Sequence, residues 1–152
     1  MKKSKGLLSI LILLLLAVIV SAARAEILSI PVEVRDGAVF VSVRINANNV
    51  TLLLDTGASN TIVDPKAVGV AEAGLVHASF LAEGHTNVSV AVIKLDLQIG
   101  KAKFIVPVVM DKLTVLQTRF GNKVQGLLGN DVLTQFKSVT ISYQTKTLEL
   151  SR

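Results

Sequence analysis

The sequence of 152 residues contains no cysteine and only two histidines, His77 and His85. The absence of cysteine excludes disulfide bonds, thiolate metal sites and a cysteine nucleophile. Two histidines are too few for a histidine-based metal site unless carboxylates supply the other ligands, so the simpler interpretation places both as surface or strand residues. The side chains that remain available for catalysis are therefore mainly carboxylates and hydroxyls.

The sequence is also not strongly basic once the N-terminal segment is left out of the count. Four of the sixteen basic residues precede Glu26, whereas all eleven acidic residues lie at or beyond it, so residues 26–152 carry a net charge of only +1. They show no basic stripe with interleaved aromatic residues, which is the pattern that follows a phosphate backbone. We therefore expect no nucleic-acid partner.

The N-terminal segment has the form of a targeting signal. Three lysines within the first five residues precede an uncharged run from Leu7 to Ala23, and Ala23 and Ala25 fit the small-residue pattern read by signal peptidase. The pattern predicts a signal peptide over residues 1–25, cut before Glu26. The run also reaches the lower length limit of a membrane span, so an uncleaved membrane anchor stays open. In both cases residues 26–152 form one exported domain, periplasmic or secreted.

From Ile30 onward, apolar residues alternate with a period of two, which predicts β-strands. Asp36-Gly37 predicts a tight type I′ turn between strands at 30–34 and 39–45. After a second turn at 46–49, the apolar run 50–54 has the pattern of a strand buried on both faces. Further strands are predicted at 75–81, 88–97, 104–110, 138–143 and 147–150.

Helical patterns are short. Asp64-Pro65 predicts a capped turn that Gly69 and Gly74 limit to one or two turns, and Asn130 or Asp131 is expected to cap a second short helix through Phe136. No repeat or linker divides residues 26–152. The sequence therefore predicts one all-β domain, a compact barrel or sandwich with one or two short helices.

Asp55 directly follows the apolar strand and opens the segment Asp55-Thr56-Gly57-Ala58-Ser59. Gly57 lets the backbone turn tightly and brings amide donors close to the carboxylate, which favours its ionised form. The same tripeptide is also ordinary turn chemistry after a strand. Taken alone, it leaves a catalytic and a structural role open.

A second segment, Gly126-Leu127-Leu128-Gly129, runs into Asn130–Leu133 late in the chain. Together, the two segments resemble the retropepsin-like (retroviral-type) aspartic proteases, including their single-domain exported bacterial members. The resemblance covers most of residues 30–150. It implies a small closed acid-protease barrel with Asp55 as the catalytic residue. It also implies that a strand carrying Leu127-Leu128-Gly129 supports the loop of Thr56, Gly57, Ala58 and Ser59 from beneath.

Because the chain carries one Asp-Thr-Gly, the resemblance implies a homodimer that hydrolyses peptide or protein substrates. Two Asp55 carboxylates close together would share a proton and titrate in coupled steps. One would act as general base on a water while its protonated partner donates to the peptide carbonyl. No metal or cofactor is required. Apolar strands beside the cleft favour extended peptides with hydrophobic residues next to the scissile bond.

The family also implies a flap, a hairpin that closes over bound peptide and excludes water. Its candidate residues are Ala82, Glu83, Gly84 and His85, which lie between two apolar strands, although any solvent-facing hairpin would have the same composition.

The chain departs from the retroviral pattern at two positions. Retroviral members commonly carry an arginine where this chain has Asn130 and an acidic residue where it has Ser59, and the two form an ion pair that helps to hold the dimer. Both are neutral here, so dimer contacts are expected to be weaker or to come from elsewhere, such as the strand at 147–150. Asp131 is interpreted as a helix N-terminal residue and not as a second catalytic carboxylate.

Two other functional classes are less favoured by the sequence. A non-catalytic, retropepsin-like peptide-binding or assembly module outside the cytoplasm is the alternative, although the intact Asp-Thr-Gly shows no sign of lost activity. A serine hydrolase is disfavoured because no Gly-x-Ser-x-Gly segment exists and only two histidines could serve as the base.

Overall fold

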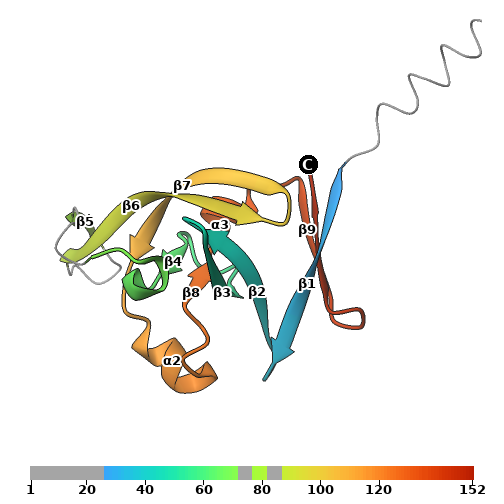
Figure 1. Cartoon of the computed structure of the whole chain (residues 1–152), viewed down its shortest axis with the longest axis horizontal. Coiled ribbons are helices and arrows are strands. Elements are labelled where there is room, and N and C mark those ends of the chain that lie inside the picture. The colour runs from blue at the N-terminus through green and yellow to red at the C-terminus, as the bar shows by residue number, and fades with distance from the viewer. Residues whose placement is uncertain (1–25, 72–76, 82–86) are drawn as a thin grey trace, which may run out of the picture.

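The computed structural model describes residues 26–71, 77–81 and 87–152, and Figure 1 shows their arrangement. The predicted signal peptide or anchor at residues 1–25 lies outside this part of the chain. Within the described residues, no helix is long and apolar enough to cross a membrane.

Six strands form a closed barrel. In spatial order they are β6 (Asn87–Ile99), β7 (Ala102–Met110), β4 (Ile62–Val63), β8 (Gly126–Leu128), β3 (Asn48–Leu54) and β2 (Ala38–Ile45). The ring closes because β6 also pairs with β2, with Arg44 opposite Gln98 and Ile45 opposite Leu97. The prediction of an all-β fold built as a small closed barrel is confirmed.

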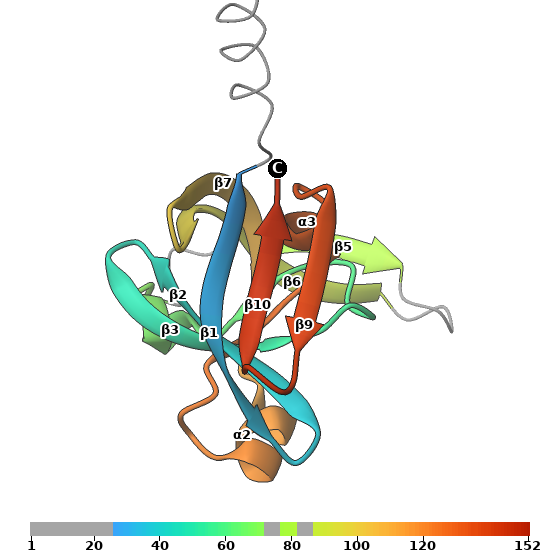
Figure 2. The same cartoon turned by 90° about the vertical axis from the view of Figure 1, so that its right-hand side faces the viewer.

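A second layer stands beside the barrel. β1 (Ile27–Arg35) pairs through its first half with β10 (Thr147–Ser151) and through its second half with β2. β10 pairs in turn with β9 (Ser138–Ser142), and Figure 2 shows β1, β10 and β9 side by side. At the other end of the sheet, β5 (His77–Leu81) pairs with β6.

The two early hairpins follow from local backbone preferences. Asp36 and Gly37 have φ values of 50° and 76°, and Asn46 and Ala47 have φ values of 45° and 70°. Positive φ at both central residues is the requirement of a type I′ turn, whose twist matches that of the flanking strands. The turn predicted at Asp36-Gly37 is therefore confirmed, and the second turn is centred on Asn46-Ala47.

Three short helical segments are present among the described residues. A 3₁₀ helix at Pro65–Val68 begins where Asp64 accepts a hydrogen bond from the Lys66 amide at 2.9 Å and ends at Gly69, as predicted. α2 (Thr114–Phe120) was not predicted from the sequence, because Leu113 provides no side-chain cap and the β-branched Thr114 and Val115 begin the helix. The prediction of a helix through Phe136 was too long, since α3 spans Asn130–Leu133 and its cap is Gly129, without a side-chain hydrogen bond.

Burial alternates along β3 and corrects one expectation. Val50 and Leu52 are almost fully buried, but Leu53 and Leu54 are only half-buried, so this strand is not covered on both faces. The reason is a cavity beside the end of β3, described below. The barrel and the second layer share one hydrophobic core. Its most completely buried large side chains include Ile45, Leu52, Leu97, Ile99, Leu128, Leu148 and Leu150.

Candidate active site

Asp55 leaves the barrel where β3 ends beside β8. The two strands are parallel, with Leu54 opposite Leu128, and the Asp55 amide donates to the Leu128 carbonyl at 3.1 Å. After the loop, the chain returns as β4 on the opposite side of β8, with Ile62 opposite Leu127. β8 therefore lies between the outgoing and returning arms of the Asp55 loop and holds both through backbone hydrogen bonds.

Two glycines allow this close approach. A Cβ atom on Gly129 would lie 2.5 Å from the backbone C and O atoms of Asn60, and one on Gly126 would collide with the Ile62 carbonyl and the Leu52 side chain. Contacts this short are not tolerated by real Cβ atoms, so any larger residue would push the loop away from β8. The Gly-Leu-Leu-Gly segment is thus required by packing around the loop.

The loop itself is held by short-range hydrogen bonds to Asp55. The Gly57 amide donates to Asp55 Oδ1 at 2.9 Å, and the Ala58 amide donates to the Asp55 carbonyl at 3.3 Å. Because Asp55 is only half-buried, this carboxylate remains open to a reactant.

The first turn of α3 completes the support of the loop. The Asn130 amide donates to the Ala58 carbonyl at 2.9 Å and the Asp131 amide donates to the Ser59 carbonyl at 3.2 Å. The Asn130 side chain reaches further and donates through Nδ2 to the Thr56 carbonyl at 2.7 Å. The structure thus brings together every residue of the two motifs, from Asp55 to Ser59 and from Leu127 to Asn130.

Thr61 is a member of this assembly that the sequence analysis missed. It is fully buried, its Oγ1 donates to Asp131 Oδ1 at 2.7 Å and its amide donates to Asp131 Oδ2 at 3.0 Å. Thr61 Oγ1 also accepts a hydrogen bond from the Gly129 amide at 3.1 Å. The Asp131 carboxylate further accepts from the Val132 amide at 2.9 Å. Asp131 is therefore engaged in structural hydrogen bonds, in agreement with its interpretation as a structural residue.

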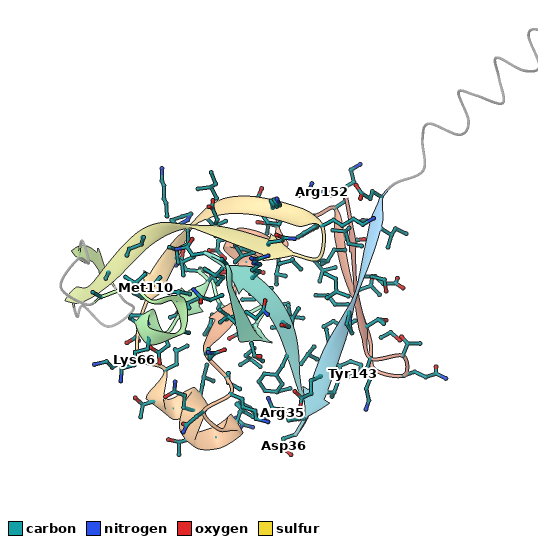
Figure 3. The ribbon with its side chains drawn as sticks, in the orientation of Figure 1. Arg35, Asp36, Lys66, Met110, Tyr143 and Arg152 are labelled. Carbon is teal, nitrogen blue, oxygen red and sulfur yellow. The ribbon has the colours of Figure 1, made fainter. Side chains whose placement is uncertain are left out.

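A cavity of about 420 Å³ opens beside Asp55 and explains the exposure of Leu53 and Leu54, which line it. Its other walls combine apolar and aromatic side chains with polar and charged ones, and α2 provides several of them. The remaining side chains on these walls include Leu116, Phe120, Ile141 and Tyr143, together with the charged Asp36 and Arg119. Figure 3 shows Asp36 at the turn between β1 and β2, at the same end of the molecule as Tyr143.

Phe120 is fixed on this wall by ring and guanidinium contacts. Its ring meets Phe40 edge-on with centroids 5.2 Å apart, and Arg119 lies 4.9 Å above the Phe120 ring. Arg35 donates through Nη1 to the Phe120 carbonyl at 3.1 Å and lies 4.4 Å from the Phe40 ring centroid. Arg35 forms an ion pair with Glu33, in which Arg35 Nε lies 2.9 Å from Glu33 Oε1. In the described part of the chain this is the sole ion pair, so Arg119 meets no carboxylate within salt-bridge distance there.

A larger cavity of about 630 Å³ lies on β2, β6 and β7, around Arg44, Asp96 and Lys103. It contains no residue of either motif. Nor do the described residues contain a cluster of three or more histidine, aspartate or glutamate side chains that could hold a metal ion. Of these two cavities, the one beside Asp55 is the one lined by residues of a motif, Asp55 and Thr56.

The predicted flap residues Ala82, Glu83, Gly84 and His85 lie outside the described residues. The strands that flank them do pair in antiparallel fashion, with Leu81 opposite Asn87. The expectation that terminal strands such as 147–150 supply dimer contacts stays a prediction. In the described sheet β10 is paired on both sides, with β1 and β9, and the strands at the two ends of the sheet are β5 and β9.

Comparison with known proteins agrees with this geometry. A family model described as "Aspartyl protease" matches residues 41–132, which span β2 to the first turn of α3 and include both motifs. The fold is similar to the crystal structure of a retropepsin-like aspartic protease from Rickettsia conorii, with a TM-score of 0.60 and 23% sequence identity over 84% of this chain and 93% of the other. At that identity the likeness establishes the fold alone. Comparison with curated protein sequences gave no match.

Proposed function

Because the chain belongs to the aspartyl protease family, we propose that it is an aspartic endopeptidase in which Asp55 carries the chemistry. The observation that supports this most directly is the setting of Asp55. Its carboxylate is half-buried at the end of a core strand, accepts the Gly57 amide at 2.9 Å and lines a cavity of about 420 Å³. A carboxylate held by a rigid loop at a cavity is suited to act as a general base.

The active form is a homodimer. Peptide hydrolysis by this chemistry needs two carboxylates, and the chain contributes a single Asp-Thr-Gly. A two-fold axis would bring Asp55 of each copy together. The pair would share one proton, so that one carboxylate activates a water and the other donates to the peptide carbonyl. Neither step involves a metal ion or another cofactor.

The substrate is an extended peptide or protein segment outside the cytoplasm, in line with the export signal that the sequence predicts over residues 1–25. The cavity beside Asp55 has walls of leucine, phenylalanine, isoleucine and tyrosine side chains. Such walls favour a large hydrophobic residue next to the scissile bond. The leader would be removed on export, or retained as an anchor that places the domain at the membrane surface.

The test is cleavage of an unbiased peptide mixture by the purified protein, across acidic and neutral pH and over a range of protein concentrations. We expect cleavage that rises faster than linearly with concentration and is abolished by Asp55→Asn. The matched control is Asp111→Asn, an exposed carboxylate outside the cavity, which should leave cleavage unchanged. Absence of cleavage at concentrations where sedimentation shows a dimer would contradict the proposal and favour a peptide-binding or assembly module.

A further inference from the structure

One peptide group connects the Asn130 side chain to Asp55. The carbonyl of Thr56 accepts the Asn130 Nδ2 donor at 2.7 Å, and the amide of Gly57 donates to Asp55 Oδ1 at 2.9 Å. The Thr56 carbonyl and the Gly57 amide belong to the same planar peptide unit. The two hydrogen bonds therefore form a continuous chain that runs from a side-chain amide to the catalytic carboxylate.

Such a chain transmits polarisation. A donor on a peptide carbonyl draws electron density toward the oxygen, which makes the N–H at the other end of the same unit a stronger donor. A stronger donor aimed at a carboxylate stabilises its ionised form over its protonated form. In addition, the 2.7 Å bond fixes the rotation of the 56–57 peptide, and thereby the direction in which the Gly57 N–H points.

We propose that Asn130 is a positioning residue that favours the ionised form of Asp55 through the peptide group between Thr56 and Gly57. The inference rests on the proposed catalytic function of Asp55. It assigns to Asn130 a contribution made within one chain, at a position where retroviral relatives commonly carry an arginine. It also means that the loop is organised for catalysis by contacts inside the protomer.

Asn130 is itself held firmly enough for this. Its amide donates to the Ala58 carbonyl at 2.9 Å, and its carbonyl accepts from the Thr134 amide at 3.0 Å and from Thr134 Oγ1 at 2.6 Å. The backbone of Asn130 is thus tied both to the loop and to α3. The Asn130 side chain therefore loses little conformational entropy when it bonds to the Thr56 carbonyl. More of the free energy of this hydrogen bond is then available to orient the 56–57 peptide.

Other charged or titratable groups also face Asp55. Asp36 from the β1–β2 turn, Arg119 from α2 and Tyr143 after β9 line the same cavity. These groups stay in place when Asn130 alone is changed. A difference between variants at position 130 is therefore the quantity that isolates the contribution of Asn130.

The first experiment uses the unmodified protein and needs no turnover. An NMR titration follows the Gly57 backbone amide and the Asn130 side-chain amide as the pH is lowered. We expect both resonances to shift with one shared midpoint, because both bonds belong to the chain that ends at Asp55. If the Gly57 resonance titrates while the Asn130 side-chain resonances stay still, the proposal is overturned.

The second experiment compares Asn130→Leu, which is close in shape but cannot donate, with Asn48→Leu. The control makes the same substitution at the start of β3, where the exposed Asn48 side chain donates to the Asn46 carbonyl at 3.3 Å and is not bonded to the Asp55 loop. A weaker Gly57 donor stabilises the ionised carboxylate less. The acidic limb of the kcat/KM profile should therefore move to higher pH in Asn130→Leu and should not move in Asn48→Leu.

If the limb of Asn130→Leu coincides with that of Asn48→Leu, the proposal is overturned. Should Asn130→Leu fail to fold, Asn130→Ala serves in the same comparison because it only shortens the side chain. Absence of cleavage by the unmodified protein would instead contradict the proposed function, and the NMR titration would still decide whether Asn130 is coupled to Asp55.

Discussion

Thr61 and Asp131 lie seventy positions apart in the sequence and are joined by two hydrogen bonds. Through its hydroxyl, Thr61 also accepts the Gly129 amide, so one buried side chain links the returning arm of the Asp55 loop, the end of β8 and the start of α3. Buried polar groups of this kind are costly when one partner is removed, because the others lose their hydrogen bonds in a dry environment. This network is therefore important for the stability of the site.

Thr61→Val should lower the free energy of unfolding by about 2–4 kcal/mol, because it removes one charge-assisted hydrogen bond and leaves the Gly129 amide without its acceptor. Urea unfolding measures the change. The control is Thr118→Val, which removes an exposed hydroxyl bonded to the Thr114 carbonyl within α2 and should cost less than about 1 kcal/mol. Equal losses in the two variants would show that the Thr61 network adds nothing to stability.

Gly129→Ala should destabilise the protein by about 2 kcal/mol or more, since its Cβ would lie 2.5 Å from the Asn60 backbone. The backbone of Gly129, with φ −97° and ψ −177°, is allowed for alanine, so the cost is steric. Gly37→Asn is the matched control, because that site has open space and a positive φ that asparagine tolerates. Thermal unfolding of both variants tests this, and a Gly129→Ala protein as stable as Gly37→Asn would contradict it.

The features that the sequence could predict are local. Positive φ at Asp36-Gly37, the cap at Asp64 and the alternation along the strands depend on neighbouring residues, and the structure has all three. The two motifs around Asp55 and Leu128 were also visible, because each is a continuous run whose composition is limited by close packing. Fold and family could therefore be recognised without coordinates.

The remaining features depend on contacts between distant residues. Nothing near Thr61 indicates that it will meet Asp131, and Leu53 and Leu54 are half-buried only because a cavity forms where α2 approaches β3. α2 itself lacks a side-chain cap at its start, and its contacts to other elements run from Phe120 to Phe40 and from Gln117 to Asp64, which lie far away in the sequence. The pairing of β10 on both sides likewise follows from the path of the whole chain.

Leu148→Ala should cost about 2–5 kcal/mol of unfolding free energy, because Leu148 is fully buried in the central strand of the second layer. Ile105→Ala, at a side chain that is 73% exposed on β7, should change stability by less than about 0.5 kcal/mol. Urea unfolding of both variants provides the comparison. A small effect of Leu148→Ala would mean that β1, β10 and β9 do not unfold together with the barrel.

Arg119→Glu should alter the charge preference for peptide substrates, because Arg119 lines the cavity beside Asp55 and is held over the Phe120 ring. Reversing this charge weakens the attraction for an acidic residue near the scissile bond and strengthens it for a basic one. For an exposed group we expect the ratio of kcat/KM between a lysine-containing and a matched glutamate-containing peptide to rise roughly fivefold at low salt. The increase should shrink as salt is added, since screening shortens the range of the interaction.

Arg44→Glu, in the separate cavity on β2, is the matched charge reversal and should leave the ratio unchanged. If both variants shift the ratio equally, substrate selection depends on the net charge of the protein and not on the cavity beside Asp55.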